Sequence, residues 1–178
     1  GEKLMLLKED DIEYSVGVAI SSDDRYLILH TGSTDNEEIH YQSLSDPEHG
    51  RVALITREDN IKIEDLEFHN DNIIMSSNKG HPSFYELFQT KIGDTIDNWE
   101  SVECIHGLNG NERINISGFV VTPTKVVIQV RNVDINEIYI VNYGAGGYDP
   151  NWKKVEIMVG ENEGVPITKL RNIGVYHS

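Results

Sequence analysis

The sequence has 178 residues, of which 30 are Asp or Glu and 15 are Lys or Arg, so the formal net charge is −15 at pH 7. This length suffices for one domain, or two, with a real core. Such acidity argues against a nucleic-acid partner, because phosphate backbones repel it. Solubility alone explains the charge most simply, although an acidic surface also attracts cationic ligands such as Lys- or Arg-rich peptides.

Membrane and secretion signals are absent from the sequence. No apolar run approaches the roughly 18 residues that a spanning helix needs, and the first residues lack the charged-then-apolar layout of a signal peptide. We therefore expect a cytoplasmic protein with no membrane partner.

The first part of the chain predicts four short strands separated by turns. Residues 12–20 alternate apolar and polar side chains, which is typical of a strand with one buried face. A second strand is expected over residues 25–31, because the continuous apolar run at residues 26–29 is typical of a strand buried on both faces. Between them, residues 21–24 are Ser and Asp, which form turns by bonding their own backbone. Two further strands are expected over residues 38–44 and 51–56.

The same order of strands then recurs twice. Each repeat has a first strand, a short turn, a strongly apolar second strand, a polar loop, a third strand, a longer loop and an outer strand. The strands of these two repeats are expected at residues 63–69, 73–75, 84–90 and 99–105, and at residues 114–121, 125–130, 137–143 and 152–158.

A propeller explains this periodicity best. Four antiparallel strands in every ~40–50 residues is the signature of a propeller blade, and the pair Asn98-Trp99 returns as Asn151-Trp152 before the last strand of the next repeat. We therefore predict an all-β fold, a β-propeller fragment of about three four-stranded antiparallel blades with partial strands at both ends. A two-sheet sandwich is the alternative, although it needs no internal repeat. The predicted partial propeller domain is 1–178, with blades at 12–57, 63–105 and 114–158, and with 165–178 as a strand of a following blade.

No segment carries a catalytic motif. A nucleophile elbow needs Gly-x-Ser-x-Gly on a turn from strand to helix, and the sequence has none. The seven histidines lack the spacing of a zinc site. Cys104, the single cysteine, excludes an internal disulfide, and its apolar strand favours a buried hydrophobe over a reactive thiol. We predict no catalytic, cofactor-binding or metal-binding residue in this chain.

Three weaker motifs have plain structural explanations. The run Gly144-Ala145-Gly146-Gly147 lacks the Gly-Lys-Ser/Thr of a phosphate loop and is expected to be a flexible blade loop. The sequon at Asn115 lies inside a predicted strand and is interpreted as a chance match. Trp99 and Trp152 occupy matched positions in the repeats, so packing between blades is favoured over stacking on a ligand.

Several stretches resemble the prolyl oligopeptidase family of serine peptidases, and its oligopeptidase B members in particular. Residues 14–18, 21–29 and 33–41 look like one blade of that family, and residues 68–78 followed by Asn98-Trp99 look like its next blade. The stretch from Thr168 to Arg171, followed by Tyr176-His177-Ser178, is similar to the family's strand that ends in Tyr-Ser-Ser. Residues 161–173 otherwise depart from the family pattern.

The resemblance implies a role in gating. Members of this family have a seven-bladed propeller that caps an α/β-hydrolase domain with a Ser-Asp-His triad, and oligopeptidase B members cleave short peptides after Lys or Arg. This chain would be about half of such a propeller. Its partners would be peptide substrates, expected to be basic, and the hydrolase domain of the same full-length protein. The parent protein would be an enzyme, whereas this chain alone is expected to be inactive.

Two rivals from other classes stay open. The chain could belong to a non-catalytic propeller that serves as an interaction scaffold, or to a sugar-binding propeller with exposed aromatic residues on one rim. In every case about three blades cannot close a ring, so apolar inter-blade faces stay exposed. We therefore expect the isolated chain to self-associate.

Overall fold

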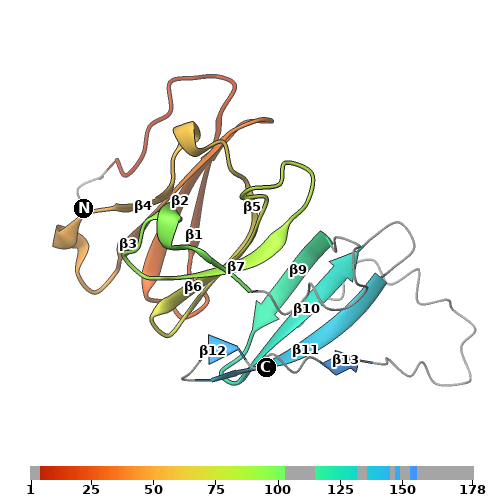
Figure 1. The fold of residues 1–178 in the computed structure, drawn as a ribbon. Coiled ribbons are helices and arrows are strands. Elements are labelled where there is room, and N and C mark those ends of the chain that lie inside the picture. The colour runs from red at the N-terminus through yellow and green to blue at the C-terminus, as the bar shows by residue number, and fades with distance from the viewer. Residues whose placement is uncertain (1–4, 103–114, 132–135, 145–146, 149–152, 156–178) are drawn as a thin grey trace, which may run out of the picture. The chain divides into compact units, whose positions relative to one another are not determined.

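The computed structural model is all-β, and its strands form three antiparallel sheets (Figure 1). It describes residues 5–102, 115–131, 136–144, 147–148 and 153–155. The chain divides into two compact units, Gly1–Val102 and Glu103–Ser178. The helices of the described residues are short 3₁₀ turns, namely η1 (Pro47–His49), η2 (Arg57–Asp59) and η3 (Ile96–Asn98). The prediction of an all-β chain is therefore confirmed.

The first sheet, called sheet 1, has its four strands in chain order. They are β1 (Ser15–Ile20), β2 (Tyr26–Gly32), β3 (Glu37–Ser43) and β4 (Val52–Ile55). A polar turn joins β1 to β2: the Ser21 amide donates to the Tyr26 carbonyl at 2.9 Å, and the Ser21 hydroxyl bonds to Asp23 at 2.6 Å. These local bonds are the reason that Ser and Asp are favoured in such turns.

Sheet 2 repeats this order within the same unit. Its strands are β5 (Ile63–His69), β6 (Asn72–Ser77), β7 (Glu86–Lys91) and β8 (Glu100–Ser101). The β5–β6 hairpin turns on two residues, and the first of them, Asn70, has φ 54°. Asn tolerates this left-handed conformation, which tight hairpins require. A capping box, in which the Thr56 amide donates to Asp59 at 2.6 Å, begins η2 in the linker between the sheets.

The second unit contains sheet 3. Its strands are β9 (Asn115–Val121), β10 (Lys125–Arg131) and β11 (Asn136–Gly144), with the short strands β12 (Gly147–Tyr148) and β13 (Lys153–Val155) both paired to β11. Along β10, Val126, Ile128 and Val130 are buried, whereas Gln129 between them is exposed. This period of two gives the strand one apolar face.

Sheets 1 and 2 share one apolar core. At its centre the Phe68 ring stacks on Tyr26, with centroids 4.8 Å apart, and meets Tyr41 edge-on at 5.4 Å. The Tyr41 hydroxyl also accepts a hydrogen bond from the Gly93 amide at 2.7 Å, so the sheets are joined by a polar contact as well. The buried members of this core are Ile39, Tyr41, Leu54, Ile55, Ile61, Ile63, Phe68, Ile73, Met75, Phe88 and Trp99.

The other face of sheet 1 is open along β1. Val16, Val18 and Ile20 are 51%, 67% and 58% exposed, because the strand register places them on the face turned away from Tyr26 and Ile28. The alternation in the sequence predicted a buried face on this strand, and that prediction is wrong for β1, although Leu29 on the same face of β2 is only 3% exposed. The strand itself begins at Ser15, later than the expected position 12.

We predict that Phe68→Ala lowers the free energy of unfolding by about 3–5 kcal/mol, because it empties the centre of the core that joins sheets 1 and 2. Urea unfolding followed by circular dichroism measures this loss. Leu44→Ala, at a side chain that is 45% exposed, is the matched control and changes stability by about 0.5 kcal/mol or less. Equal losses in the two variants would contradict the packing described.

Candidate channel-lining strands

The first strand of each sheet lies at a sheet edge. These strands are β1, β5 and β9. The sheets of a propeller surround a central channel, so one edge strand of every sheet borders it. Edge strands are therefore the place to look for groups that would meet a ligand passing along such a channel.

One of these three strands is strongly acidic. Glu64, Asp65 and Glu67 all lie on β5, whereas β1 and β9 carry no acidic residue. Glu64 is exposed and the other two are half-buried. The sequence signal for this feature is three carboxylates within four residues of a strand that also supplies core side chains.

A β-bulge shapes the start of β5. The register shifts between Ile63, which pairs with Ser77, and Asp65, which pairs with Ser76, so that Glu64 is the extra residue. Such a bulge re-aims side chains and is favoured at sheet edges. Here the bulge places two carboxylates, Glu64 and Asp65, next to each other. Asp65 has a register partner on β6, whereas Glu64 has none.

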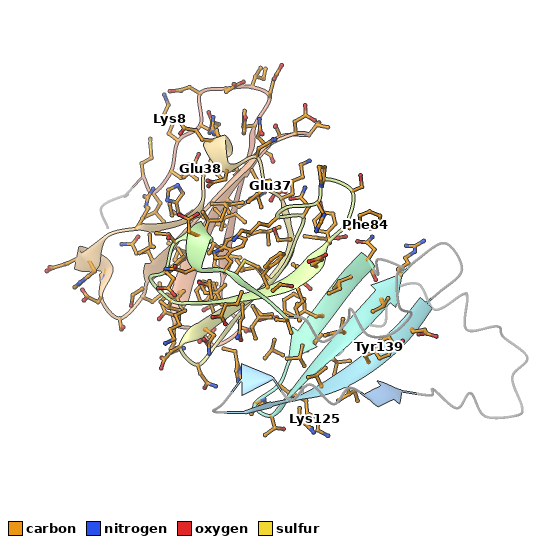
Figure 2. All side chains as sticks on the ribbon, viewed as in Figure 1. Lys8, Glu37, Glu38, Phe84, Lys125 and Tyr139 are labelled. Carbon is orange, nitrogen blue, oxygen red and sulfur yellow. The ribbon has the colours of Figure 1, made fainter. Side chains whose placement is uncertain are left out.

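A third carboxylate reaches the bulge from sheet 1. Glu37, the first residue of β3, accepts a hydrogen bond from the Ile63 amide at 3.0 Å. Burial, then the charges of Glu64 and Glu37, raise the pKa of Tyr85 in the β6–β7 loop. In Figure 2, Glu37 lies at the end of the sheets where the loop carrying Phe84 is found. Carboxylates from two sheets therefore gather at this end of β5.

The opposite end of β5 is tied to the β1–β2 turn. The Ser22 hydroxyl donates to Glu67, and the Arg25 guanidinium donates to the Asn70 carbonyl beyond β5. Arg25 is itself paired with Asp23 at 2.7 Å. These bonds add polar contacts between the β1–β2 turn and the end of β5 to the apolar core that the two sheets share.

The electrostatics of this edge favour a positive ligand. Partial desolvation of the Glu64 carboxylate, and secondly the charge of Asp65, raise the pKa of Glu64 above its ordinary value. Both causes penalise the ionised carboxylate. A cation placed beside the pair would remove much of this penalty, so binding of a cation and ionisation of Glu64 reinforce each other.

The histidines that the structure describes form no cluster. His40 pairs with Glu38 at 2.6 Å, His49 pairs with Asp46 at 2.8 Å, and His81 lies 3.7 Å from Glu86. Among the described residues, no group of three or more His, Cys, Asp or Glu side chains could hold a metal ion. His106, His177 and Cys104 lie outside the part of the chain that the structure describes.

Of the two tryptophans, only Trp99 is described. It is 6% exposed and packs near Phe88, with ring centroids 6.2 Å apart, in the core between sheets 1 and 2. The Lys79 ammonium lies 5.3 Å from the centre of its ring. Trp99 thus packs between two sheets, as predicted, whereas Trp152 and the glycines at 145–146 lie outside the described residues.

Over the residues that the structure describes, no helix is long and apolar enough to cross a membrane.

The fold and the repeated four-stranded order define a part of a β-propeller. A family model described as prolyl oligopeptidase, N-terminal beta-propeller domain, matches residues 2–161. The chain therefore belongs to this family, and the resemblance found in the sequence is confirmed. No curated protein matches the chain significantly.

Solved structures of this family share the fold. Oligopeptidase B from Trypanosoma brucei with covalently bound antipain, in the closed form, is 20% identical, with a TM-score of 0.67 over 88% of this chain and 21% of that one. Oligopeptidase B from Leishmania major is 15% identical, with a TM-score of 0.69 over 85% and 21%. A structure from an analysis of two prolyl endopeptidases is 13% identical, with a TM-score of 0.59 over 82% of this chain and 20% of that one. The chain spans about a fifth of the length of these proteins.

We predict that Glu64→Gln stabilises the fold at neutral pH. The folded-state pKa of Glu64 is raised, so its contribution to stability is fully present below its ordinary pKa and is lost as the pH rises through the raised value. The amide of the Gln variant does not ionise, so the variant does not lose this stability as the pH rises. Thermal melts of both proteins should differ at pH 7 and coincide in acid, below the ordinary pKa. A variant that is less stable than the parent at pH 7 would contradict the assignment.

Proposed function

We propose that this chain is part of the substrate gate of a cytoplasmic serine oligopeptidase that hydrolyses short peptides after basic residues. Membership of the prolyl oligopeptidase propeller family supports the gate. The likeness to two oligopeptidase B structures supports the preference for basic residues. The three sheets would be consecutive blades, within 12–57, 63–105 and 114–158, and 165–178 would supply a strand of the next one.

The observation that carries the proposal is the acidic edge of β5. In the proposed ring, β1, β5 and β9 are the inner strands, so Glu64 and Asp65 border the channel. Carboxylates in a narrow, low-dielectric channel raise the local concentration of cationic substrates and speed their entry. They also repel acidic peptides, and the ring itself excludes folded proteins.

The chemical step belongs to a domain outside this chain. The sequence has no Gly-x-Ser-x-Gly elbow, and the proposed reaction is acyl transfer by a serine that a histidine activates. The gate therefore acts on substrate entry, that is, on KM and on specificity, and it leaves the covalent chemistry to the hydrolase domain.

A non-catalytic propeller scaffold is the rival from another class. Its propeller would bind a partner protein on one rim, and its gene would encode no hydrolase domain. The coding sequence after Ser178 separates the two proposals: a Gly-x-Ser-x-Gly elbow followed by a late histidine supports the peptidase, and their absence supports the scaffold.

We predict that the 178-residue chain alone does not hydrolyse a fluorogenic Arg-peptide, whereas the complete polypeptide does.

In the complete enzyme, the double variant Glu64→Gln/Asp65→Asn raises KM for the Arg-peptide about two- to fivefold at low salt and leaves kcat unchanged, because only steering is lost. Glu48→Gln, an exposed carboxylate in η1, is the control and changes neither constant. Turnover by the purified chain alone would refute the proposal that the catalytic residues lie in a separate hydrolase domain. An unchanged KM in the double variant would refute the proposed role of the β5 carboxylates.

A second prediction concerns the open face of sheet 1. Its apolar side chains Val16, Val18 and Ile20 are each more than half exposed, and β1 is also an unpaired edge, so the isolated chain should self-associate. Val18→Lys places a charge on this face and should lower the mean mass toward the monomer in sedimentation velocity. A monodisperse monomer at high concentration in the unsubstituted chain would contradict this expectation.

A further inference from the structure

A glycine in sheet 1 makes room for a histidine. Gly32 is the last residue of β2, and a Cβ atom added there would lie 2.8 Å from Cε1 and 2.9 Å from Nε2 of His30. Atoms do not approach so closely, so a larger residue at position 32 would displace the imidazole. The backbone does not require the glycine, because Gly32 is not among the residues with positive φ. The glycine is therefore explained by the imidazole that lies over it, in keeping with glycines in strands that mark a close approach.

His30 lies on the face of sheet 1 that is turned toward sheet 2. It shares this face with Tyr26 and Ile28, which pack against the common core, because side chains two residues apart on a strand point the same way. In register, His30 pairs with Gly17 of β1 and with Ile39 of β3. The residue is half-buried, and neither ring nitrogen is a buried atom without a partner. The imidazole thus lies at the margin of the core, within reach of solvent.

Glu37 lies beside this imidazole. It is the register partner of Gly32, and its Cγ atom is 3.7 Å from the same added Cβ position. One of its carboxylate oxygens accepts the Ile63 amide at 3.0 Å. In the described part of the chain, the other oxygen and the His30 ring form no hydrogen bond or ion pair. The two side chains therefore border one position and keep polar atoms available there.

The negative charge of Glu37 is not neutralised by its basic neighbour in the linker. Lys62, which precedes Ile63, donates its ammonium to the Thr34 carbonyl, and it forms no ion pair with Glu37 among the described residues. Glu64 of the bulge lies close enough to share an electrostatic partner with Glu37, because both charges raise the pKa of Tyr85. The position beside His30 therefore belongs to the same negative region as the acidic edge of β5.

We propose that His30 is a specificity-determining residue of the gate, which binds the guanidinium group of a substrate arginine together with Glu37 and favours arginine over lysine. This inference rests on the proposed function. A guanidinium is a planar fork of five N–H donors, whereas an ammonium is a compact and strongly hydrated charge. The fork donates to the open oxygen of Glu37 and to the acceptor nitrogen that every neutral imidazole has. A lysine ammonium keeps more of its hydration, so it gains less from the imidazole.

Gly32 is the positioning residue of this site. Gly32→Ala should displace the His30 ring and weaken the preference for arginine as much as His30→Leu does, with no further loss when the two are combined. Gly17→Ala is the matched control, because a Cβ atom there would lie 3.7 Å from Nδ1 of His30, which is an ordinary contact. It should leave the preference intact.

Chemical modification tests the site in the complete polypeptide without relying on turnover. Diethyl pyrocarbonate modifies accessible imidazoles, and mass spectrometry measures the rate at each histidine. Acetyl-argininamide should protect His30 at concentrations about three- to tenfold lower than acetyl-lysinamide, the size that one hydrogen bond confers. His49, whose side chain is 87% exposed in η1, is the control histidine and should not be protected. Glu37→Gln, which keeps an acceptor for the Ile63 amide but removes the charge, should weaken the protection by both amides.

Kinetics of the complete enzyme give the second readout. Two fluorogenic peptides that differ only in their basic residue, Arg or Lys, are compared between variants, so the preference of the hydrolase domain itself cancels. His30→Leu should raise KM for the Arg-peptide about three- to tenfold more than KM for the Lys-peptide, with kcat unchanged. His30→Gln, whose amide oxygen is also an acceptor, should keep more than half of the preference, and it replaces His30→Leu if that variant fails to fold.

The two proposals fail in different ways. Equal protection of His30 by the two amides, or an unchanged ratio of the two KM values in His30→Leu, would overturn the role of His30 while the gate of β5 stands. If the complete polypeptide hydrolyses neither peptide, the proposed function fails, and the protection of His30 alone decides whether this position binds a guanidinium.

Discussion

The contact between sheets 1 and 2 is the constraint on which the rest of this structure depends. Each sheet has an apolar face whose exposure to water would destabilise the fold. Phe68 fills the space between the two sheets and packs against Tyr26 and Tyr41. Because the two sheets are fixed face to face, their first strands, β1 and β5, keep a fixed relation to each other. The polar ties between Ser22 and Glu67 and between Arg25 and the Asn70 carbonyl then set the register of these edges.

This arrangement places core side chains and carboxylates on a single strand. In β5, Ile63 and Phe68 point into the core, whereas Glu64 is exposed and Asp65 lies on the face turned away from sheet 1. The same strand can therefore anchor the sheet and present carboxylates, and the cost is visible in the raised pKa of Glu64. Like charges held side by side at an edge are unfavourable for folding, and under the proposed function a cationic substrate would offset their repulsion.

The periodicity of the sequence predicted the fold well. Alternation and turn residues placed the strands, because period two and Asn or Asp turns follow from local backbone sterics. The apolar run at residues 73–75 correctly predicted a buried strand, with Ile73 and Ile74 at 0% exposure. The bulge at Glu64 and the approach of Glu37 could not be predicted, because both depend on how two sheets meet.

The central claim, that the acidic edge of β5 borders a substrate channel, is tested most directly by an experimental structure of the complete polypeptide with a bound arginine-containing peptide inhibitor. The account predicts a closed ring in which β5 is an inner strand and in which the Glu64 and Asp65 carboxylates face the path of the peptide. A ring in which β5 lies on the outer rim, or in which these carboxylates face bulk solvent away from the channel, would contradict it.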